Sequence, residues 1–142
     1  MGRFKCSLHA GHETTGMFKS LQRLTARAAK GARGEGKACE LLKRLGYKIL
    51  ERNYRLKFGE IDIIAQKDDT ICFVEVRSRT DGSFGAPELS VNKRKQSRII
   101  RTAQTYIRKN KIKDMVIRFD IIAVAGEEER VTHYPNAFQS RY

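Results

Sequence analysis

The chain has 142 residues, of which 40% are hydrophobic, and this is enough for one folded domain with a core of its own. Its 29 Lys and Arg residues outnumber 16 Asp and Glu residues and leave a formal net charge of +13. Such an excess favours polyanionic partners (DNA, RNA or an anionic membrane), and a basic protein without such a partner is the alternative. No apolar run reaches membrane-spanning length and no secretory signal is evident, so we expect no membrane span and a cytoplasmic location.

Residues 1–33 are predicted to be a basic N-terminal extension. The first sixteen residues have little apolar content and no sustained period, so we expect disorder there. Residues 17–30 predict a basic amphipathic helix, or alternatively a weakly structured extension, because apolar residues recur at helical spacing: Phe18, Leu21, Leu24 and Ala28.

The three cysteines make an odd count. Cys39 and Cys72 fall at apolar positions of predicted elements, so we expect both to be buried and reduced, as in a cytosolic protein. The spacing of Cys6, His9 and His12 is compatible with metal ligands, but these three residues lack a fourth ligand. We therefore expect no metal site there.

Residues 34–142 are predicted to form an α/β domain. It begins with a helix that opens at Glu35 and ends at Gly46, because apolar residues recur at i, i+3, i+4 and i+7: Ala38, Leu41, Leu42 and Leu45. Glu35 either interacts favourably with the dipole at the start of this helix or belongs to a functional site. A strand is predicted next, over residues 47–55.

Residues 60–66 and 70–77 alternate in polarity and predict a β-hairpin with a turn at residues 67–69. Because residues two apart share a face of a strand, one face is entirely apolar: Ile61, Ile63, Ala65, Cys72, Val74 and Val76. The opposite face carries Asp62 and Glu75 beside three apolar side chains: Ile64, Ile71 and Phe73.

A turn centred between Asp68 and Asp69 sets the register of this hairpin. It pairs Gln66 with Ile71, Ile64 with Phe73, Asp62 with Glu75, and Glu60 with Arg77. Directly opposed Cβ atoms lie ~4.5–5.5 Å apart, and like charges at that distance destabilise a sheet. The acid pair therefore favours a bound cation or a raised pKa, unless this face is simply solvated.

The next predicted helix follows the Gly-containing stretch 80–87, with Asn92 as its N-cap. Its inner face is predicted to carry Ile99, Ala103 and Tyr106 or Ile107. Residues 92–113 contain no Asp or Glu, which favours contact with phosphates. Basic residues crowd the rest of the helix surface: Lys93, Arg94, Lys95, Arg98, Arg101 and Arg108.

The C-terminal part predicts a strand over residues 116–124, in which we expect Asp120 to form a salt bridge. A turn at residues 127–129 leads into a short strand over residues 131–134, which Pro135 should end. We expect Phe138 to pack against the core.

Several blocks of this sequence, taken together, resemble a known family. They are RGEGKACELLKRLGYKILERNYR, FGEIDIIA, FVEVRSR, FGAPELSVNKRKQSRI and RFDIIAV, and the resemblance runs from about residue 34 to residue 138. In this order they resemble the YraN family of small uncharacterised bacterial proteins, within the PD-(D/E)XK nuclease superfamily.

The resemblance implies a central mixed β-sheet flanked by helices, similar to archaeal Holliday-junction resolvases, with Mg²⁺ or Mn²⁺ as cofactor. It implies that Asp62 and Glu75 bind the metal with help from the Val76 carbonyl, and that Glu35 assists nearby or through water. The metal would polarise the scissile phosphate and lower the pKa of an attacking water.

The same resemblance implies nucleic acid, probably DNA in structured or branched form, as the partner, and raises a homodimer as an expectation. Lys95 and Gln96 match positions of the family's basic helix, which closes the side of the domain that carries the active site. Together with Lys93 and Arg98 they are the expected nucleic-acid contacts. The hypothesis is thus a metal-dependent endonuclease-like protein.

One residue departs from the family pattern, because Arg77 stands where the motif has lysine. Arginine stays protonated and cannot act as a base at neutral pH, although it can bind a phosphate and stabilise transition-state charge. The alternative hypothesis is therefore a nucleic-acid-binding module of the same fold without catalytic activity.

Overall fold

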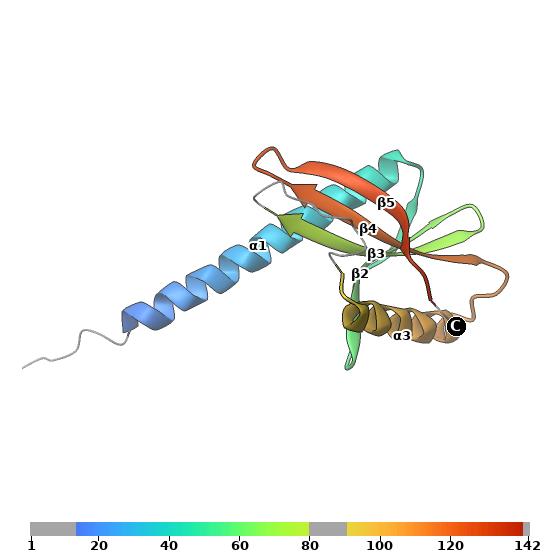
Figure 1. Cartoon of the computed structure of the whole chain (residues 1–142), viewed down its shortest axis with the longest axis horizontal. Helices are drawn as coiled ribbons and strands as arrows, with labels where there is room; N and C mark the ends of the chain where they lie inside the picture. Colours follow the sequence, from blue (N-terminus) through green and yellow to red (C-terminus); the bar gives the residue numbers. More distant parts are fainter. Residues whose placement is uncertain (1–13, 80–90, 141–142) are drawn as a thin grey trace, which may run out of the picture.

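The structure is a computed structural model that describes residues 14–79 and 91–140. A five-stranded sheet in the order β1-β2-β3-β4-β5 forms its centre (Figure 1). Strands β3 and β4 are parallel and the other neighbours are antiparallel, so the predicted α/β class with a mixed sheet is confirmed. The elements are α1 (Thr14–Arg44), β1 (Lys48–Leu56), β2 (Gly59–Lys67), β3 (Thr70–Arg79), α3 (Lys93–Lys109), β4 (Val116–Ala125) and β5 (Arg130–Phe138).

Three predictions concern other parts of the chain. The expected disorder of residues 1–13, the set Cys6, His9 and His12, and the stretch 80–87 lie outside the described residues. Within the described part, neither helix combines the length and hydropathy needed to cross a membrane.

Helix α1 is one uninterrupted helix of 31 residues. The expected disorder at residues 14–16 and the expected helix start at Glu35 are therefore wrong. The reason is that residues 14–34 contain no proline and many good helix formers, so the two predicted helices join. Glu35 consequently lies well inside the helix, and the first-turn interpretation of its carboxylate does not apply.

The N-terminal half of α1 projects away from the sheet (Figure 1). Its side chains are exposed from residue 16 to residue 29, including the apolar residues Met17, Phe18, Leu21 and Leu24. Gly34 packs closely against β3, since a Cβ atom there would lie 2.5 Å from the Ser78 hydroxyl oxygen and would require that side chain to shift. The helix ends at Gly46, as predicted, with a positive φ of 89°.

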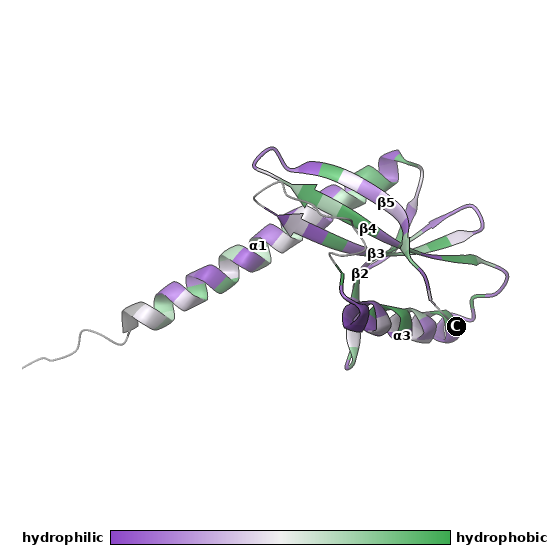
Figure 2. Cartoon of the chain, in the orientation of Figure 1, coloured by the Kyte–Doolittle hydropathy of each residue, from purple (hydrophilic) through white to green (hydrophobic). Residues whose placement is uncertain are grey.

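Each face of the sheet has its own hydrophobic core, as the green stretches on the inner strands indicate (Figure 2). On one face α1 covers Ile63, Ala65, Cys72, Val74 and Ile122. On the other face α3 covers the larger core, which includes Ile64, Phe73, Ile99, Tyr106, Phe119 and Phe138. The predicted burial of Cys39, Cys72 and Phe138 is confirmed, and both thiols are free.

The predicted register of the hairpin is confirmed where β2 and β3 pair, with Ile64 opposite Phe73 and Gln66 opposite Ile71. Ile61 is a correction, because it packs in the core under α3 with Ile64 rather than on the face of Ile63. The backbone ladder ends at the Ile63–Val74 pair, so the predicted pairs Asp62–Glu75 and Glu60–Arg77 are not part of it. Beyond this point β2 no longer keeps the strict alternation of a flat hairpin.

Helix α3 has the predicted N-cap, since the Lys95 N–H donates to Asn92 Oδ1 over 2.9 Å. Its buried face, Ile99, Ala103 and Tyr106, is also as predicted, with Thr102 added. Pro135 does not end the last strand, which corrects the prediction, because β5 is an edge strand and tolerates a residue without an N–H.

Gly59 joins β2 to α3 closely enough to give a test of this packing. A Cβ atom there would lie 2.5 Å from Thr102 Oγ1 and 3.0 Å from the Arg98 carbonyl oxygen. The Thr102 hydroxyl donates to that same carbonyl over 2.7 Å, so it is not free to move aside. Gly59→Ala should therefore lower the free energy of unfolding in urea by about 1–3 kcal/mol.

The matched control is Gly36→Ala. Gly36 lies inside α1 with nothing within 4 Å of its would-be Cβ, so the same change should stabilise the protein by roughly 0.5–1 kcal/mol. Equal effects of the two substitutions would contradict the close contact between β2 and α3.

Candidate functional site

Asp62 and Glu75 lie where the ladder between β2 and β3 stops. The last backbone pair is Ile63 with Val74, and two residues further along β3 the Val76 N–H donates to Asp62 Oδ2 over 2.8 Å. A side-chain carboxylate thus takes the place of a main-chain acceptor. This bond fixes the Asp62 carboxylate beside Glu75, so the structure brings these two predicted residues together.

Burial makes this acid pair electrostatically costly. The Glu75 side chain is only 4% exposed. Burial and the neighbouring Glu75 carboxylate together raise the pKa of Asp62 to about 7. The pair therefore favours either a shared proton or a bound cation that compensates both charges.

Two cations already lie beside Glu75. Lys95 Nζ from α3 forms an ion pair with Glu75 Oε1, and Arg77 Nη1 lies 3.9 Å from the same oxygen. The predicted contact between the basic helix and the acid pair is thus made by Lys95. Arg77 follows Glu75 by two residues in β3, so both side chains are on the face that α3 covers.

Glu35 lies on the other side of the pair, on α1, and is half-buried. Burial and the charge of Asp62 raise the pKa of Glu35, while a hydrogen bond from the Asn53 side chain acts in the opposite direction. Among residues 14–79 and 91–140, no group of three or more His, Cys, Asp or Glu side chains is placed to hold one metal ion. Glu35 therefore influences Asp62 through its charge rather than by joining it in a three-ligand cluster.

The donor set of the acid pair fits a hard divalent cation. Mg²⁺ prefers oxygen ligands and is commonly held by one or two carboxylates, with water and substrate phosphate completing the shell. Asp62 and Glu75 supply two carboxylates, and the pKa of Asp62 is raised by burial and by the negative charge of Glu75, a charge that a dication would offset.

The other residues predicted on the basic helix have different surroundings. Lys93 and Arg98 are exposed, and Arg98 lines the groove described next. Gln96 donates from Nε2 to the Val91 carbonyl over 2.8 Å, so its amide stabilises the start of α3.

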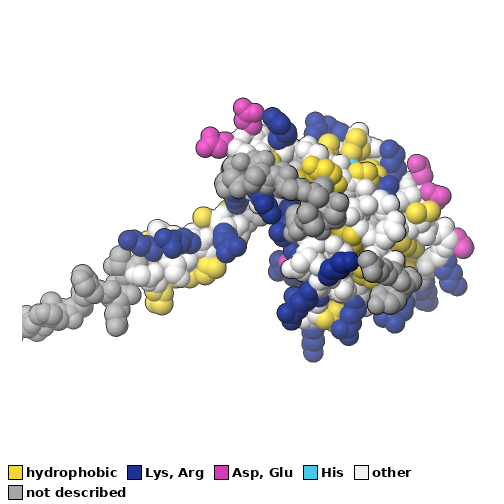
Figure 3. All heavy atoms as spheres, viewed as in Figure 1, with side chains coloured by type: hydrophobic (Ala, Val, Ile, Leu, Met, Phe, Trp, Pro, Cys, Tyr) yellow, Lys and Arg dark blue, Asp and Glu magenta, His cyan; other side chains and the backbone are white. Residues whose placement is uncertain are grey.

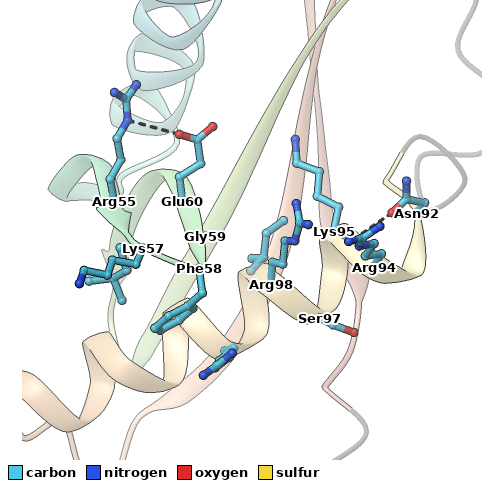
Figure 4. Close-up of a pocket in the computed structure, with 13 residues that line it drawn as sticks. Arg55, Lys57, Phe58, Gly59, Glu60, Asn92, Arg94, Lys95, Ser97 and Arg98 are labelled. Atoms are coloured by element: carbon cyan, nitrogen blue, oxygen red, sulfur yellow. Dashed lines mark hydrogen bonds and ion pairs between the residues drawn. The ribbon is translucent and has the colours of Figure 1, made fainter.

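A groove of about 1020 Å³ lies between the β1–β2 turn and the N-terminal half of α3 (Figure 4). Six basic side chains line it: Arg55, Lys57, Arg94, Lys95, Arg98 and Arg101. Among the described residues that line it, the acidic one is Glu60, which pairs with Arg55 over 3.3 Å. In Figure 3 the Lys and Arg side chains gather on the lower part of the globular domain, where α3 lies in Figure 1.

The wall contributed by residues 55–60 was not predicted from the sequence. Its signal is present as two basic residues, Arg55 and Lys57, around an apolar turn, but nothing local shows that this turn faces α3. The close contact at Gly59 creates the groove, and it depends on the tertiary structure.

Asp120 is the contrasting buried acid and confirms the predicted salt bridge. Its carboxylate accepts from Arg118 Nε and Nη2 over 2.9 Å each and from the Asn136 N–H, and it contacts His133 Nε2 at 2.8 Å. Burial opposes ionisation, but these hydrogen bonds outweigh it and hold the pKa of Asp120 at about 2. Asp120 is therefore a stably charged structural residue, whereas Asp62 lacks this degree of compensation.

The sequence matches one family over most of this structure. The model of "Uncharacterised protein family UPF0102" matches residues 34–124. The chain belongs to the UPF0102 family. The UPF0102 protein of Persephonella marina is 49% identical over 113 residues, which cover 80% of this chain and 96% of that protein. The UPF0102 protein of Clostridioides difficile is 51% identical over 109 residues, which cover 77% and 96% respectively.

The UPF0102 match confirms the resemblance to the YraN family. It contains Asp62, Glu75 and Arg77 and both walls of the groove, while the N-terminal half of α1 lies before its first residue. The candidate site is thus entirely within the UPF0102 part of the chain.

The raised pKa of Asp62 predicts how stability depends on pH. Between its ordinary value of 3.8 and about 7 the folded chain binds more protons at this residue than the unfolded chain. The contribution of Asp62 to the free energy of unfolding is therefore fully present below pH 3.8 and is lost as the pH rises through about 7. Asn cannot ionise and can still accept from Val76, so Asp62→Asn should raise the free energy of unfolding at pH 8, measured with a chelator present.

This gain should shrink as the pH falls toward 4. Asp68→Asn is the control, because Asp68 is exposed in the hairpin turn at a φ of 52° that Asn also adopts, and it should change stability by less than about 0.5 kcal/mol. An Asp62→Asn variant less stable than wild type at pH 8 would refute the repulsive acid pair.

Proposed function

We propose that this UPF0102 protein is a divalent-metal-dependent endonuclease acting on structured or branched DNA. One observation carries the proposal: the buried carboxylate of Glu75 and the half-buried carboxylate of Asp62 converge beside a basic groove, and Lys95 both contacts Glu75 and lines that groove. A metal site next to a phosphate-binding surface is the arrangement that phosphodiester hydrolysis requires.

In this proposal Asp62 and Glu75 hold Mg²⁺ or Mn²⁺, and the Val76 carbonyl is the expected third ligand. When bound, the metal supplies Lewis-acid activation of the scissile phosphate and of a water molecule. The Val76 N–H keeps the Asp62 carboxylate oriented through its 2.8 Å hydrogen bond. Glu35 keeps the local potential negative from the side of α1, which favours the dication.

The cationic residues bind and orient the phosphate. Lys95 is close to Glu75 and at the inner side of the groove, so its ammonium can neutralise a phosphate oxygen delivered to the acid pair. The Arg77 guanidinium can donate two parallel hydrogen bonds to a phosphate. Its role is therefore electrostatic, and a base for the attacking water has to come from elsewhere.

The groove supports a nucleic-acid partner because, among the described residues, four of its six cations remain after Arg55 has paired with Glu60 and Lys95 with Glu75. Contacts of this kind bind the backbone with little sequence preference and weaken as salt is added. Cutting both strands of a branch takes two active sites, so two chains per branch are part of the proposal. The buried free thiols of Cys39 and Cys72 fit the reducing cytoplasm.

A second function is favoured by Arg77. If the motif position requires a lysine for proton transfer, the protein binds branched nucleic acid without cutting it. The buried acid pair speaks against this alternative, because two desolvated carboxylates reduce stability and a binding module gains nothing from them.

The deciding experiment incubates the protein with four-way, flapped and linear DNA in Mg²⁺, in Mn²⁺ and in chelator. We expect cutting of branched DNA that requires metal. Asp62→Asn and Glu75→Gln should each reduce the rate by at least about 100-fold with binding retained, because they remove metal ligands and leave the groove intact.

Asp68→Asn again serves as the control and should cut like wild type. Arg77→Lys should retain or increase the rate. Metal-dependent cutting that is unchanged in Asp62→Asn would contradict the assigned site, and binding without cutting under every condition would favour the inactive module.

A further inference from the structure

The β1–β2 turn places an aromatic ring in the basic groove. Phe58 lies at this turn between Lys57 and Gly59, and it lines the groove together with residues of α3 (Figure 4). The Arg101 guanidinium lies over the Phe58 ring, 4.2 Å from its centroid. This aromatic–guanidinium pair is the one planar platform among the described residues that line the groove.

The platform is held in place by the backbone. Gly59 follows Phe58 directly and packs against Thr102 and the Arg98 carbonyl so closely that no side chain fits. The turn therefore cannot slide along α3 without losing this contact. Such fixed geometry favours a binding surface, because little conformational freedom is lost when a ligand binds.

The charges around the platform are those of a phosphate-binding track. Lys57 lies next to Phe58 on the turn, and Arg94 and Arg98 lie along the facing helix. A duplex can use these cations, but its bases are stacked on one another and cannot reach Phe58. An unpaired strand can use both features, since its bases are free to stack on aromatic or guanidinium planes.

From this combination we propose that the groove between the β1–β2 turn and α3 binds an unpaired strand, with a base extending the Phe58–Arg101 stack. The inference rests on the proposed nucleic-acid partner and specifies it: the substrate carries a single-stranded segment next to the scissile phosphate. Lys95 links the two sites, because it lines the groove and contacts Glu75.

The volume of the groove agrees with such a ligand. At about 1020 Å³ it lies at the upper end of the roughly 300–1,000 Å³ typical of pockets for small ligands, so it has room for more than one nucleotide. The strand would run past the cations of α3 toward the acid pair, which gives a reason why a branch or flap is preferred over a plain duplex.

The test measures binding of the full chain to a fluorescent single strand and to a blunt duplex of the same sequence, at one salt concentration and in chelator. Wild type should bind the single strand more tightly. Phe58→Ala should weaken single-strand binding by about 5- to 150-fold, the loss expected for one stacked base, and change duplex binding by less than about twofold.

Arg101→Lys is the second variant, because it keeps the charge and removes the planar group at an exposed position. It should weaken single-strand binding by about two- to fivefold and leave duplex binding unchanged. Arg55→Lys is its matched control in the same groove, where the guanidinium pairs with Glu60 rather than with a ring. This control should not alter the preference for single strands.

The stacking site would be overturned if Arg101→Lys weakened binding to the single strand and to the duplex equally, or if neither variant weakened single-strand binding. The groove would then be a site for duplex phosphates. A thermal unfolding measurement shows whether the Phe58→Ala protein is folded, so that a loss of binding is not confused with misfolding. If Phe58→Ala is unstable, the binding of Arg101→Lys tests the stacking site instead. Because binding is measured without metal, this outcome is independent of cleavage. If the protein cuts DNA in an Asp62-dependent way but does not prefer single strands, the single-strand site is rejected and the proposed nuclease function stands.

Discussion

The repulsion between a buried and a half-buried carboxylate is the constraint on which the rest of this site depends. Asp62 and Glu75 come from neighbouring strands, and the fold brings them together by ending the backbone ladder and letting Val76 donate to a side chain instead. Burial and proximity raise the pKa of Asp62 to about 7, so the folded chain keeps a group that destabilises it near neutral pH. Asp120 shows that the same fold can supply enough hydrogen bonds and positive charge to keep a buried carboxylate ionised where that carboxylate has a structural role.

The surroundings of the pair follow from how β2 leaves the sheet. Beyond the ladder β2 turns its Ile61 into the core under α3, and Gly59 brings the β1–β2 turn against that helix. The turn and the helix then form a groove with six basic side chains, and Lys95 connects it to Glu75. A break in strand pairing thus produces both the acid site and the adjoining basic groove, which explains why they lie side by side.

Local sequence patterns predicted the parts of this structure that depend on local periodicity. The hairpin register, the Asn92 cap and the buried face of α3 follow from alternation, capping chemistry and helical spacing. The continuity of α1 was missed because glycines at residues 31, 34 and 36 look like a helix boundary, whereas Gly34 serves a close contact with β3. Pro135 was misjudged because a strand's position at the edge is not visible locally. The groove wall at Phe58 could not be predicted, since it depends on a contact between residues 59 and 102.

Calorimetric titration with Mn²⁺ or Mg²⁺ tests the central claim most directly, because it asks whether the two acids share one ion without requiring activity or DNA. Our account predicts one ion bound per chain at pH 7.5, with proton release that reflects the raised pKa of Asp62, and loss of this binding in Glu75→Gln. Binding of the same stoichiometry and affinity in that variant, or no binding to the wild-type protein, would contradict it.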